Sequence, residues 1–420
     1  MKFRYLVTGL LLIPFGISCN QQPAKQKPKR GFGHLTAIDS LIQKEIGVDH
    51  IAGAVIQVKR GDSVLHRAAY GYANKYSYDM QPLKNPEKMT VDHLFDLASL
   101  TKVCATTFSI MKLVDEEKIA IDDPIYKYLP EFNKGEKAKI TIRNLLTHTA
   151  GLYQWKPTYY FASNPRECYQ YIAQLPLKWK VGAGRHYSDL GFLLLGDIIK
   201  RISGQRLDHF VTQNIYKPLH LKHTVFNPLN KGFKKIAATS HGNPFEKHMA
   251  YDDDFGYKVN VDPTSWDGWR QYTLRGEVND GNSWYANGGV AGHAGLFSTV
   301  DDLQMLVDLL LHKGKFEGRQ IISSSVIDAF LTKDSYGNGL GWAMDPDVIY
   351  AKGAPSGTFG HTGFTGTNIV AVPKDSLSII LLTNRQNVVT QKNGYYFDLG
   401  PLRQAIFDAV YQRVSGKSYN

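Results

Sequence analysis

The chain has 420 residues, of which 43% are hydrophobic and 21% are charged. This composition is ordinary for a globular protein and excludes a mostly disordered chain, and the length suits one large domain or two ordinary ones. The net charge of +11 does not indicate nucleic-acid binding, because six basic residues and no acid lie within residues 1–32, and the remaining +5 forms no long basic stripe.

The first 19 residues have the pattern of a secretory signal: two basic residues, an uncharged apolar run, and small residues before Cys19. The apolar run is too short to predict a membrane span. The small residues resemble the processing site of a bacterial lipoprotein, although a leucine is usual where Gly16 stands, so we expect Cys19 to be lipidated. Residues 20–32 are polar with two prolines and predict a flexible tether. The alternative is an ordinary cleaved signal peptide and a free secreted product.

Helix and strand patterns alternate along the rest of the chain. Apolar spacing predicts a helix over 34–47, and two runs that meet at a turn over 60–62 predict a pair of strands. The later predicted elements are helices near 100–117 and 189–203, a loop-rich stretch over about 225–295, a helix at about 301–313 capped by Ser298 or Thr299, two strands on either side of Lys374-Asp375, and a last helix at about 400–414.

This order predicts one α/β domain of the α+β type over residues 33–415. Strands from both ends of the chain, about 33–95 and 300–415, would form one sheet with helices on both faces. The residues between them, about 100–300, would form a mainly helical inserted lobe. A cleft between the sheet and this lobe is the default place for a functional site.

Cysteines and short motifs exclude several kinds of site. Apart from Cys19 the chain has only Cys104 and Cys168, too few for a disulfide framework, and Cys104 lies on the apolar face of a predicted helix. No zinc-type Cys/His spacing, Walker loop or Gly-x-Gly-x-x-Gly motif occurs, so we expect no metal and no cofactor. The absence of a Gly-x-Ser-x-Gly elbow disfavours an α/β-hydrolase.

The Ser-x-x-Lys pattern occurs twice, at Ser99–Lys102 and Ser109–Lys112. Residues i and i+3 share one side of a helix, so either pair could place a hydroxyl beside an amine. Ser99 lies at the start of the predicted helix, where free N–H groups favour a developing negative charge, and a buried Lys102 would have a lowered pKa and could accept its proton. Ser109 lies well inside the predicted helix, so we expect Ser109 and Lys112 to be ordinary helix residues without a catalytic role. The alternative for Ser99 is a capping serine with a surface lysine.

Two later segments offer partners for Ser99. Tyr187 falls just before the helix at 189–203, and a tyrosine beside an ammonium can act as base or acid. His361-Thr362-Gly363 is predicted to open a strand, where the glycine would let a substrate backbone approach. Taken alone, each is as well explained as a structural tyrosine or a glycine-rich turn.

Ser-x-x-Lys, Tyr-Ser-Asp and His-Thr-Gly, in this order, resemble the serine β-lactamase and penicillin-binding protein superfamily. The likeness is closer to class C β-lactamases, family VIII esterases and the penicillin-binding-protein-4B-like branch, and it covers about residues 33–414. It implies a β-lactamase/transpeptidase-like fold, with an antiparallel sheet flanked by helices and a large inserted lobe. It also implies that an oxyanion hole is formed by the N–H of Ser99 and one from the strand after His361.

The resemblance implies roles for four residues. Ser99 would be the acylated nucleophile, Lys102 the amine that activates it, and Tyr187 the general base and acid. His361 would fill the place usually held by lysine, with Thr362, Gly363 and Arg385 as further candidates for substrate binding.

Two departures from the family pattern affect the expected substrate. Asp189 stands where asparagine is usual, and it could hold Lys102 cationic or pair with a substrate amine. His361 replaces a permanent cation with a group that is about half charged near pH 6.5. Both changes disfavour anionic β-lactams and free terminal carboxylates, unless Arg385 compensates.

The sequence therefore predicts a serine hydrolase of the bacterial cell envelope, lipid-anchored and facing the periplasm or the exterior. It would cleave an ester or amide as a D-Ala-D-Ala carboxypeptidase-like enzyme or esterase, with weak or no β-lactamase activity, on a small-molecule or peptidoglycan-derived substrate. The alternatives are a transacylase that uses an alcohol acceptor, and a cell-wall-binding lipoprotein with a vestigial site. The sequence indicates no oligomeric state.

Overall fold

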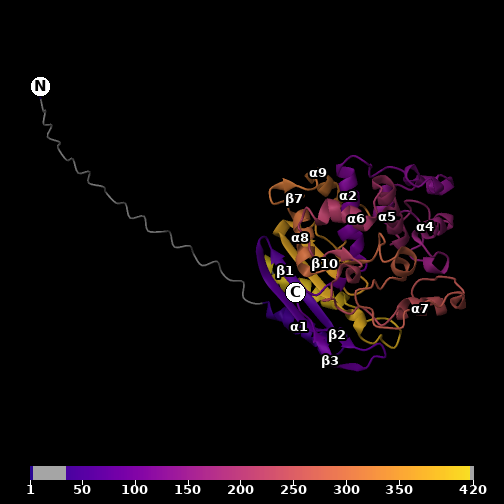
Figure 1. The fold of residues 1–420 in the computed structure, drawn as a ribbon, viewed down its shortest axis with the longest axis horizontal. Coiled ribbons are helices and arrows are strands. Elements are labelled where there is room, and N and C mark those ends of the chain that lie inside the picture. Colours follow the sequence, from indigo (N-terminus) through magenta and orange to yellow (C-terminus); the bar gives the residue numbers. More distant parts are fainter. Residues whose placement is uncertain (3–34, 417–420) are drawn as a thin grey trace. The chain divides into compact units, whose positions relative to one another are not determined.

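Six antiparallel strands form the main sheet, in the order β3-β2-β1-β11-β10-β9 (Figure 1). The computed structural model describes residues 1–2 and 35–416, so the predicted signal peptide, the lipidation site Cys19 and the tether lie outside the described residues. The strands are β1 (Gly53–Arg60), β2 (Ser63–Tyr76), β3 (Pro82–Lys88), β9 (Phe359–Thr362), β10 (Asn368–Val372) and β11 (Leu377–Thr383).

The position of β11 between two cores explains why five of its seven residues are large and apolar. Leu377, Ile379 and Leu381 lie in the core beneath α1 (Thr36–Gly47) and α10 (Gly400–Ser415), which pack against each other. Ile380 and Leu382 lie in the larger core on the opposite face. There α8 (Val300–Leu311) packs against β1 and β11. A strand that is covered on both faces is buried on both sets of alternate residues. This confirms the predicted antiparallel sheet flanked by helices.

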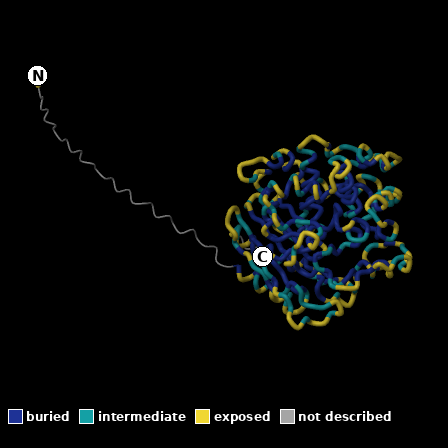
Figure 2. Tube along the Cα trace, viewed as in Figure 1, coloured by how far each residue is buried: buried dark blue, intermediate teal, exposed yellow. Residues whose placement is uncertain are grey.

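Between β3 and β9 the longer regular elements are helices joined by long loops, and Figure 1 shows α2, α4, α5 and α6 grouped to one side of the sheet. Figure 2 shows buried segments filling the interior of the folded body and exposed ones forming its rim. Among the helices of residues 35–416, none combines the length and hydrophobicity needed to span a membrane. The other elements are β4 (Phe95–Asp96), α2 (Phe108–Asp115), α3 (Ile142–Leu146), α4 (Pro165–Gln174), α5 (Asp189–Ser203), α6 (Leu207–Val211), β5 (Val225–Phe226), α7 (Pro244–Tyr251), β6 (Leu296–Ser298), β7 (Lys315–Phe316), β8 (Arg319–Gln320) and α9 (Ser324–Phe330).

Several helix ends lie where the sequence predicts them. The α5 helix ends at Gly204, whose φ of 70° is the left-handed conformation that glycine adopts without strain. Thr299 caps α8, with its side chain accepting a hydrogen bond from the N–H of Asp302.

Three local predictions are wrong. His361 and Thr362 end β9 rather than open a strand, and Gly363 follows in the turn toward β10. The β3 strand was missed because two prolines disfavour a strand, yet the sheet edge tolerates them. The loop-rich stretch contains α7, whose start at Pro244 suits the first turn of a helix.

Candidate active site

A tight turn delivers Ser99 to the start of the helix that leads into α2. Ala98 has a φ of 44°, and the next residue after Ser99 is already helical. The buried Asp96 holds this turn by accepting hydrogen bonds from the N–H of Ala98 at 2.9 Å and of Asn279 at 2.6 Å. Burial raises the pKa of Asp96 to about 6, against these hydrogen bonds. The predicted position of Ser99, just before a helix, is therefore what the backbone adopts.

Lys102 is fully buried and lies beside the Ser99 hydroxyl. Its Nζ donates to Ser99 Oγ at 2.9 Å and lies 2.6 Å from Asp189 Oδ1. Burial lowers the pKa of Lys102, but Asp189 and then Tyr187 raise it by more, so the net direction is upward. The prediction that burial leaves Lys102 with a lowered pKa is wrong, because the residue that replaces asparagine here is an anion.

The second Ser-x-x-Lys pair shows no such arrangement. Ser109 donates to the carbonyl of Ala105 at 2.8 Å, and Lys112 lies 3.6 Å from both Asp115 and Glu116. Ser109 is fully buried, whereas Lys112 lies on a partly exposed side of the same helix. Its environment is that of an ordinary helix residue.

Tyr187 completes the group around Ser99. Lys102 Nζ lies 4.9 Å from the centre of its ring, and the positive charge of Lys102 favours the anionic form of Tyr187. Burial outweighs these effects, so the pKa of Tyr187 is raised. His148 packs against the Tyr187 ring, with ring centres 4.4 Å apart, and its Nδ1 accepts a hydrogen bond from the N–H of Ser188 at 3.0 Å. Ser99 and Lys102 thus share a hydrogen bond, and Tyr187 lies against the Lys102 ammonium and lines the same hollows as Ser99.

The end of β9 places His361 near Ser99 and Tyr187, and the turn that follows β9 packs against the segment before Ser99. Thr365 and Thr367 tie this turn to the segment before Ser99, donating to the carbonyls of Asp96 at 2.7 Å and Leu97 at 3.1 Å. Gly363 is required here, because a Cβ would lie 2.4 Å from the Leu97 carbonyl oxygen.

His361 is neutral rather than half charged. Its Nδ1 lies 2.8 Å from the carbonyl oxygen of Thr362, which can only accept, so Nδ1 carries the proton and Nε2 is left as an acceptor. Burial, then the nearby Lys102, lower the pKa of His361 to about 3. The sequence expectation failed because it used the pKa of an exposed histidine.

Two hollows border Ser99, and both also contact Tyr187 and Phe364. The first, here called the Arg185 hollow, has a volume of about 340 Å³ and is lined by Ser99, Arg185, Tyr187, Ala343, Val348, His361, Thr362 and Phe364. The second, here called the acidic hollow, has a volume of about 150 Å³, and its polar lining includes Asp189, Glu246, Asp280 and His293. A substrate carbonyl at Ser99 would therefore have space on two sides.

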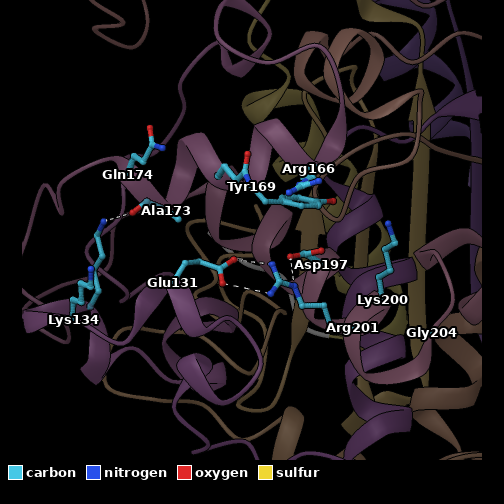
Figure 3. A pocket seen from close by; sticks show the side chains of 12 residues that line it. Glu131, Lys134, Arg166, Tyr169, Ala173, Gln174, Asp197, Lys200, Arg201 and Gly204 are labelled. Carbon is cyan, nitrogen blue, oxygen red and sulfur yellow. Dashed lines mark hydrogen bonds and ion pairs between the residues drawn. The ribbon is translucent and has the colours of Figure 1, made fainter.

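A larger hollow of about 960 Å³ lies elsewhere, along α4 and α5, and contains none of the predicted site residues (Figure 3). Its Arg201 pairs with Glu131 at 2.7 Å and Asp197 at 2.8 Å. This hollow has the larger volume, but Ser99 and Tyr187 line the two smaller hollows. We therefore place the candidate active site at the smaller hollows.

Of the residues that line the acidic hollow, the sequence prediction named Ser99, Tyr187 and Asp189 but missed Glu246, Asp280 and His293. Glu246 accepts from the Tyr159 hydroxyl at 2.9 Å and from the N–H of Gly281 at 2.8 Å, and burial, with repulsion from Asp280, raises its pKa to about 8. Although burial raises the pKa of Asp280, His293 at 2.8 Å lowers it overall. Glu246 lies on α7, and Asp280 and His293 lie on loops. No motif or regular spacing in the sequence links these three residues.

Arg385 does not reach Ser99. Its guanidinium donates to the carbonyl oxygens of Phe364 and Phe397, and it lies over the rings of Phe364 and Tyr396. It therefore holds the loop that carries Phe364. The cation that lines the hollow is Arg185, two residues before Tyr187, a position that the sequence prediction passed over.

One group of side chains has the spacing of a metal site. Single ligand atoms of Asp189, Asp280 and His293 lie within 4.8 Å of one another. The ammonium of Lys102 already pairs with Asp189 at 2.6 Å, so a divalent cation would meet a positive charge there.

Replacing Asp189 with asparagine is expected to move the rising limb of the pH–rate profile to lower pH, by about 1–3 units. Asp189 raises the pKa of both Lys102 and Tyr187, so its removal lets the pair lose a proton at lower pH. The measurement is kcat/KM of a p-nitrophenyl ester between pH 5 and 10. Asp115→Asn, beside Lys112, is the matched control and should leave the limb in place. An unmoved limb in Asp189→Asn would contradict the role given to this carboxylate.

Comparisons with known proteins agree with this geometry. The sequence model of the family described as Beta-lactamase matches residues 38–398. The chain is 34% identical over 376 residues to an N-acetylmuramyl-L-alanine amidase of Bacillus subtilis strain 168, covering 84% of this chain and 81% of that protein. It is 33% identical over 445 residues to a protein of Escherichia coli K12 provisionally named D-alanyl-D-alanine carboxypeptidase, covering 99% of this chain and 98% of that protein.

Among solved structures, the chain is similar to EstCE1, described as a hydrolase with promiscuous acyltransferase activity. The TM-score is 0.65 at 21% identity, over 90% of this chain and 98% of the other. At this identity the likeness shows a shared fold.

Proposed function

The chain belongs to the beta-lactamase family and is a serine hydrolase, and from this premise we propose that it cleaves an ester or amide bond in a cell-wall-type peptide through an acyl-enzyme on Ser99. The names of its relatives, an amidase and a carboxypeptidase, support the substrate class. The observation that carries the proposal is the Ser99–Lys102 hydrogen bond, with Tyr187 beside the Lys102 ammonium, at the border of two hollows.

The first step requires a base for the Ser99 proton. The charges of Lys102 and Tyr187 influence each other, so loss of one proton from this pair would leave either a tyrosinate beside an ammonium or a neutral amine beside a phenol. Ser99 Oγ then attacks the carbonyl carbon while its proton passes to this pair. The pair gives the proton to the leaving group as the bond to that group breaks. Water then attacks the acyl carbon and passes a proton to the pair, and the pair returns a proton to Ser99 as the acyl-enzyme bond breaks.

The negative charge that develops on the carbonyl oxygen needs donors. The backbone N–H groups of Ser99 and Phe364 have no acceptor among the described residues, and both residues border the Arg185 hollow. Such free N–H groups can stabilise an oxyanion, and they are worth about 3 kcal/mol each in comparable sites. They would serve as the oxyanion hole.

The test is a substrate profile of the full-length protein against Ser99→Ala, on p-nitrophenyl esters, nitrocefin and a D-Ala-D-Ala peptide. We expect Ser99-dependent release from the esters and the peptide, and little or none from nitrocefin. Adding an alcohol such as methanol separates hydrolysis from transfer, because a transacylase would form the methyl ester in preference to the acid. No Ser99-dependent turnover by a folded protein on any of these substrates would contradict the proposal and favour a vestigial, cell-wall-binding role.

We also propose that the enzyme is held at a membrane of the bacterial envelope by lipid on Cys19, a residue outside the described chain. The full-length protein expressed in a bacterial host should sediment with membranes and require detergent for release. Cys19→Ala should remove it from the membrane fraction, whereas Cys104→Ala, which alters a buried cysteine, should not. Equal membrane recovery of wild type and Cys19→Ala would contradict the anchor.

A further inference from the structure

We propose that Arg185 binds a carboxylate on the leaving group of the substrate, and so makes a free terminal carboxylate part of what the enzyme recognises. This inference rests on the proposed function, since it concerns the same acyl transfer. Its starting observation is that Arg185 lines one hollow together with Ser99, Tyr187, His361 and Thr362.

The guanidinium of Arg185 is held in place at one nitrogen only. Its Nε donates to Asn338 Oδ1 at 2.8 Å, and its carbon lies 5.9 Å from the centre of the Tyr187 ring. Among the described residues, its two terminal nitrogens have no hydrogen-bond partner, and no carboxylate lies within 4 Å. Burial lowers the pKa of Arg185, but a guanidinium stays protonated in proteins. A fixed cation with free donors therefore faces the hollow.

The other cations near Ser99 are committed elsewhere. Lys102 pairs with Asp189, Arg385 donates to backbone carbonyls, and His361 is neutral. Of the residues that line the Arg185 hollow, Arg185 is the single cation. The planar fork of an arginine matches the two oxygens of a carboxylate.

The two hollows differ in charge, and this difference fixes the side on which an anion binds. Asp189 and Asp280 line the acidic hollow, so a carboxylate placed there would be repelled. On the other side, Arg185 attracts it, and Thr362 lines the same wall. A carboxypeptidase-like cleavage releases an amino acid with a free carboxylate, which would leave through the Arg185 hollow.

The covalent step itself is unchanged by this contact. The peptide C–N bond breaks as the Ser99 Oγ–C bond forms, and the proton of Ser99 ends on the departing amine. Arg185 touches only the carboxylate, so it binds and orients the leaving group and does not exchange a proton.

The test compares a thioester of an N-acyl-D-alanine whose leaving group is thioglycolate with the methyl ester of the same thioester. In Arg185→Gln we expect kcat/KM for the free acid to fall about 10- to 100-fold, mainly through KM, which is the range for losing a hydrogen bond to a charged group. The methyl ester should change less than about 3-fold. Arg185→Lys should restore part of the preference, because it keeps the charge and loses the fork. Arg166→Gln, an exposed arginine at the distant hollow, is the control and should change neither substrate.

Two outcomes would overturn the inference. One is an equal loss on acid and methyl ester in Arg185→Gln, which would show that the residue supports Tyr187 or the fold. The other is an undiminished preference for the acid. A p-nitrophenyl ester without a carboxylate separates these from failure of the proposed function, since its Ser99-dependent turnover tests the nucleophile and does not involve Arg185.

Discussion

Replacing Ser99 with alanine is expected to lower kcat by about 10⁵-fold while leaving the fold intact. The side chain lost is the nucleophile, and removal of a catalytic serine in an acyl-transfer enzyme leaves only what binding and the oxyanion donors supply. The Ser99 hydroxyl accepts one hydrogen bond, from Lys102, so its loss costs little stability. The measurement is kcat on a p-nitrophenyl ester, with thermal unfolding to check the fold.

The chain offers its own matched control for this variant. Ser109→Ala changes the serine of the second Ser-x-x-Lys pair, whose hydroxyl only donates to a carbonyl within the helix. It should retain at least half of the wild-type kcat. If Ser109→Ala lost activity as Ser99→Ala did, or if Ser99→Ala remained active, the choice between the two pairs would be wrong.

Replacing Lys102 with methionine is expected to lower kcat/KM by about 10³- to 10⁴-fold and also to destabilise the protein. The rate falls because the pair that carries the Ser99 proton is broken. The stability falls because Asp189, whose side chain is 16% exposed, loses the cation 2.6 Å away. Breaking a buried pair costs about 3–5 kcal/mol, and the partial exposure of Asp189 favours the lower end.

A second substitution separates these two effects. In Lys102→Met combined with Asp189→Asn no unpaired charge remains, so most of the lost stability should return while activity stays low. Lys112→Met, at the second pair, should change the rate less than 2-fold. Recovery of activity in the double variant would contradict a catalytic role for Lys102 and leave only a structural one.

The fold could be predicted largely because its signals are local. The apolar run of β11, the helix end at Gly204 and the helix cap at Thr299 each depend on a few neighbouring residues. The β3 strand and α7 were missed for the same reason, since prolines near each disfavour a regular element unless the position at a sheet edge or a helix start is known.

The order of the three motifs predicted that Ser99, Lys102, Tyr187 and His361 lie together, and in the structure they do, but the motifs did not give the charge states of these residues. The charge states of Lys102 and His361 depend on burial and on neighbours that are far apart in the sequence. Asp189 was read as a possible partner of Lys102, and the structure has that ion pair. The structure shows that Arg185, and not Arg385, lines the hollow beside Ser99. The sequence could not show this, because it depends on the paths of two loops that are far apart in the chain.

The central claim is that Ser99 is the residue that becomes acylated. The most direct measurement is peptide mapping by mass spectrometry after the full-length protein reacts with a fluorophosphonate. We expect one adduct, on the peptide that contains Ser99, and slower labelling in Lys102→Met. An adduct on a different residue, or no adduct in a folded wild-type protein, would contradict it.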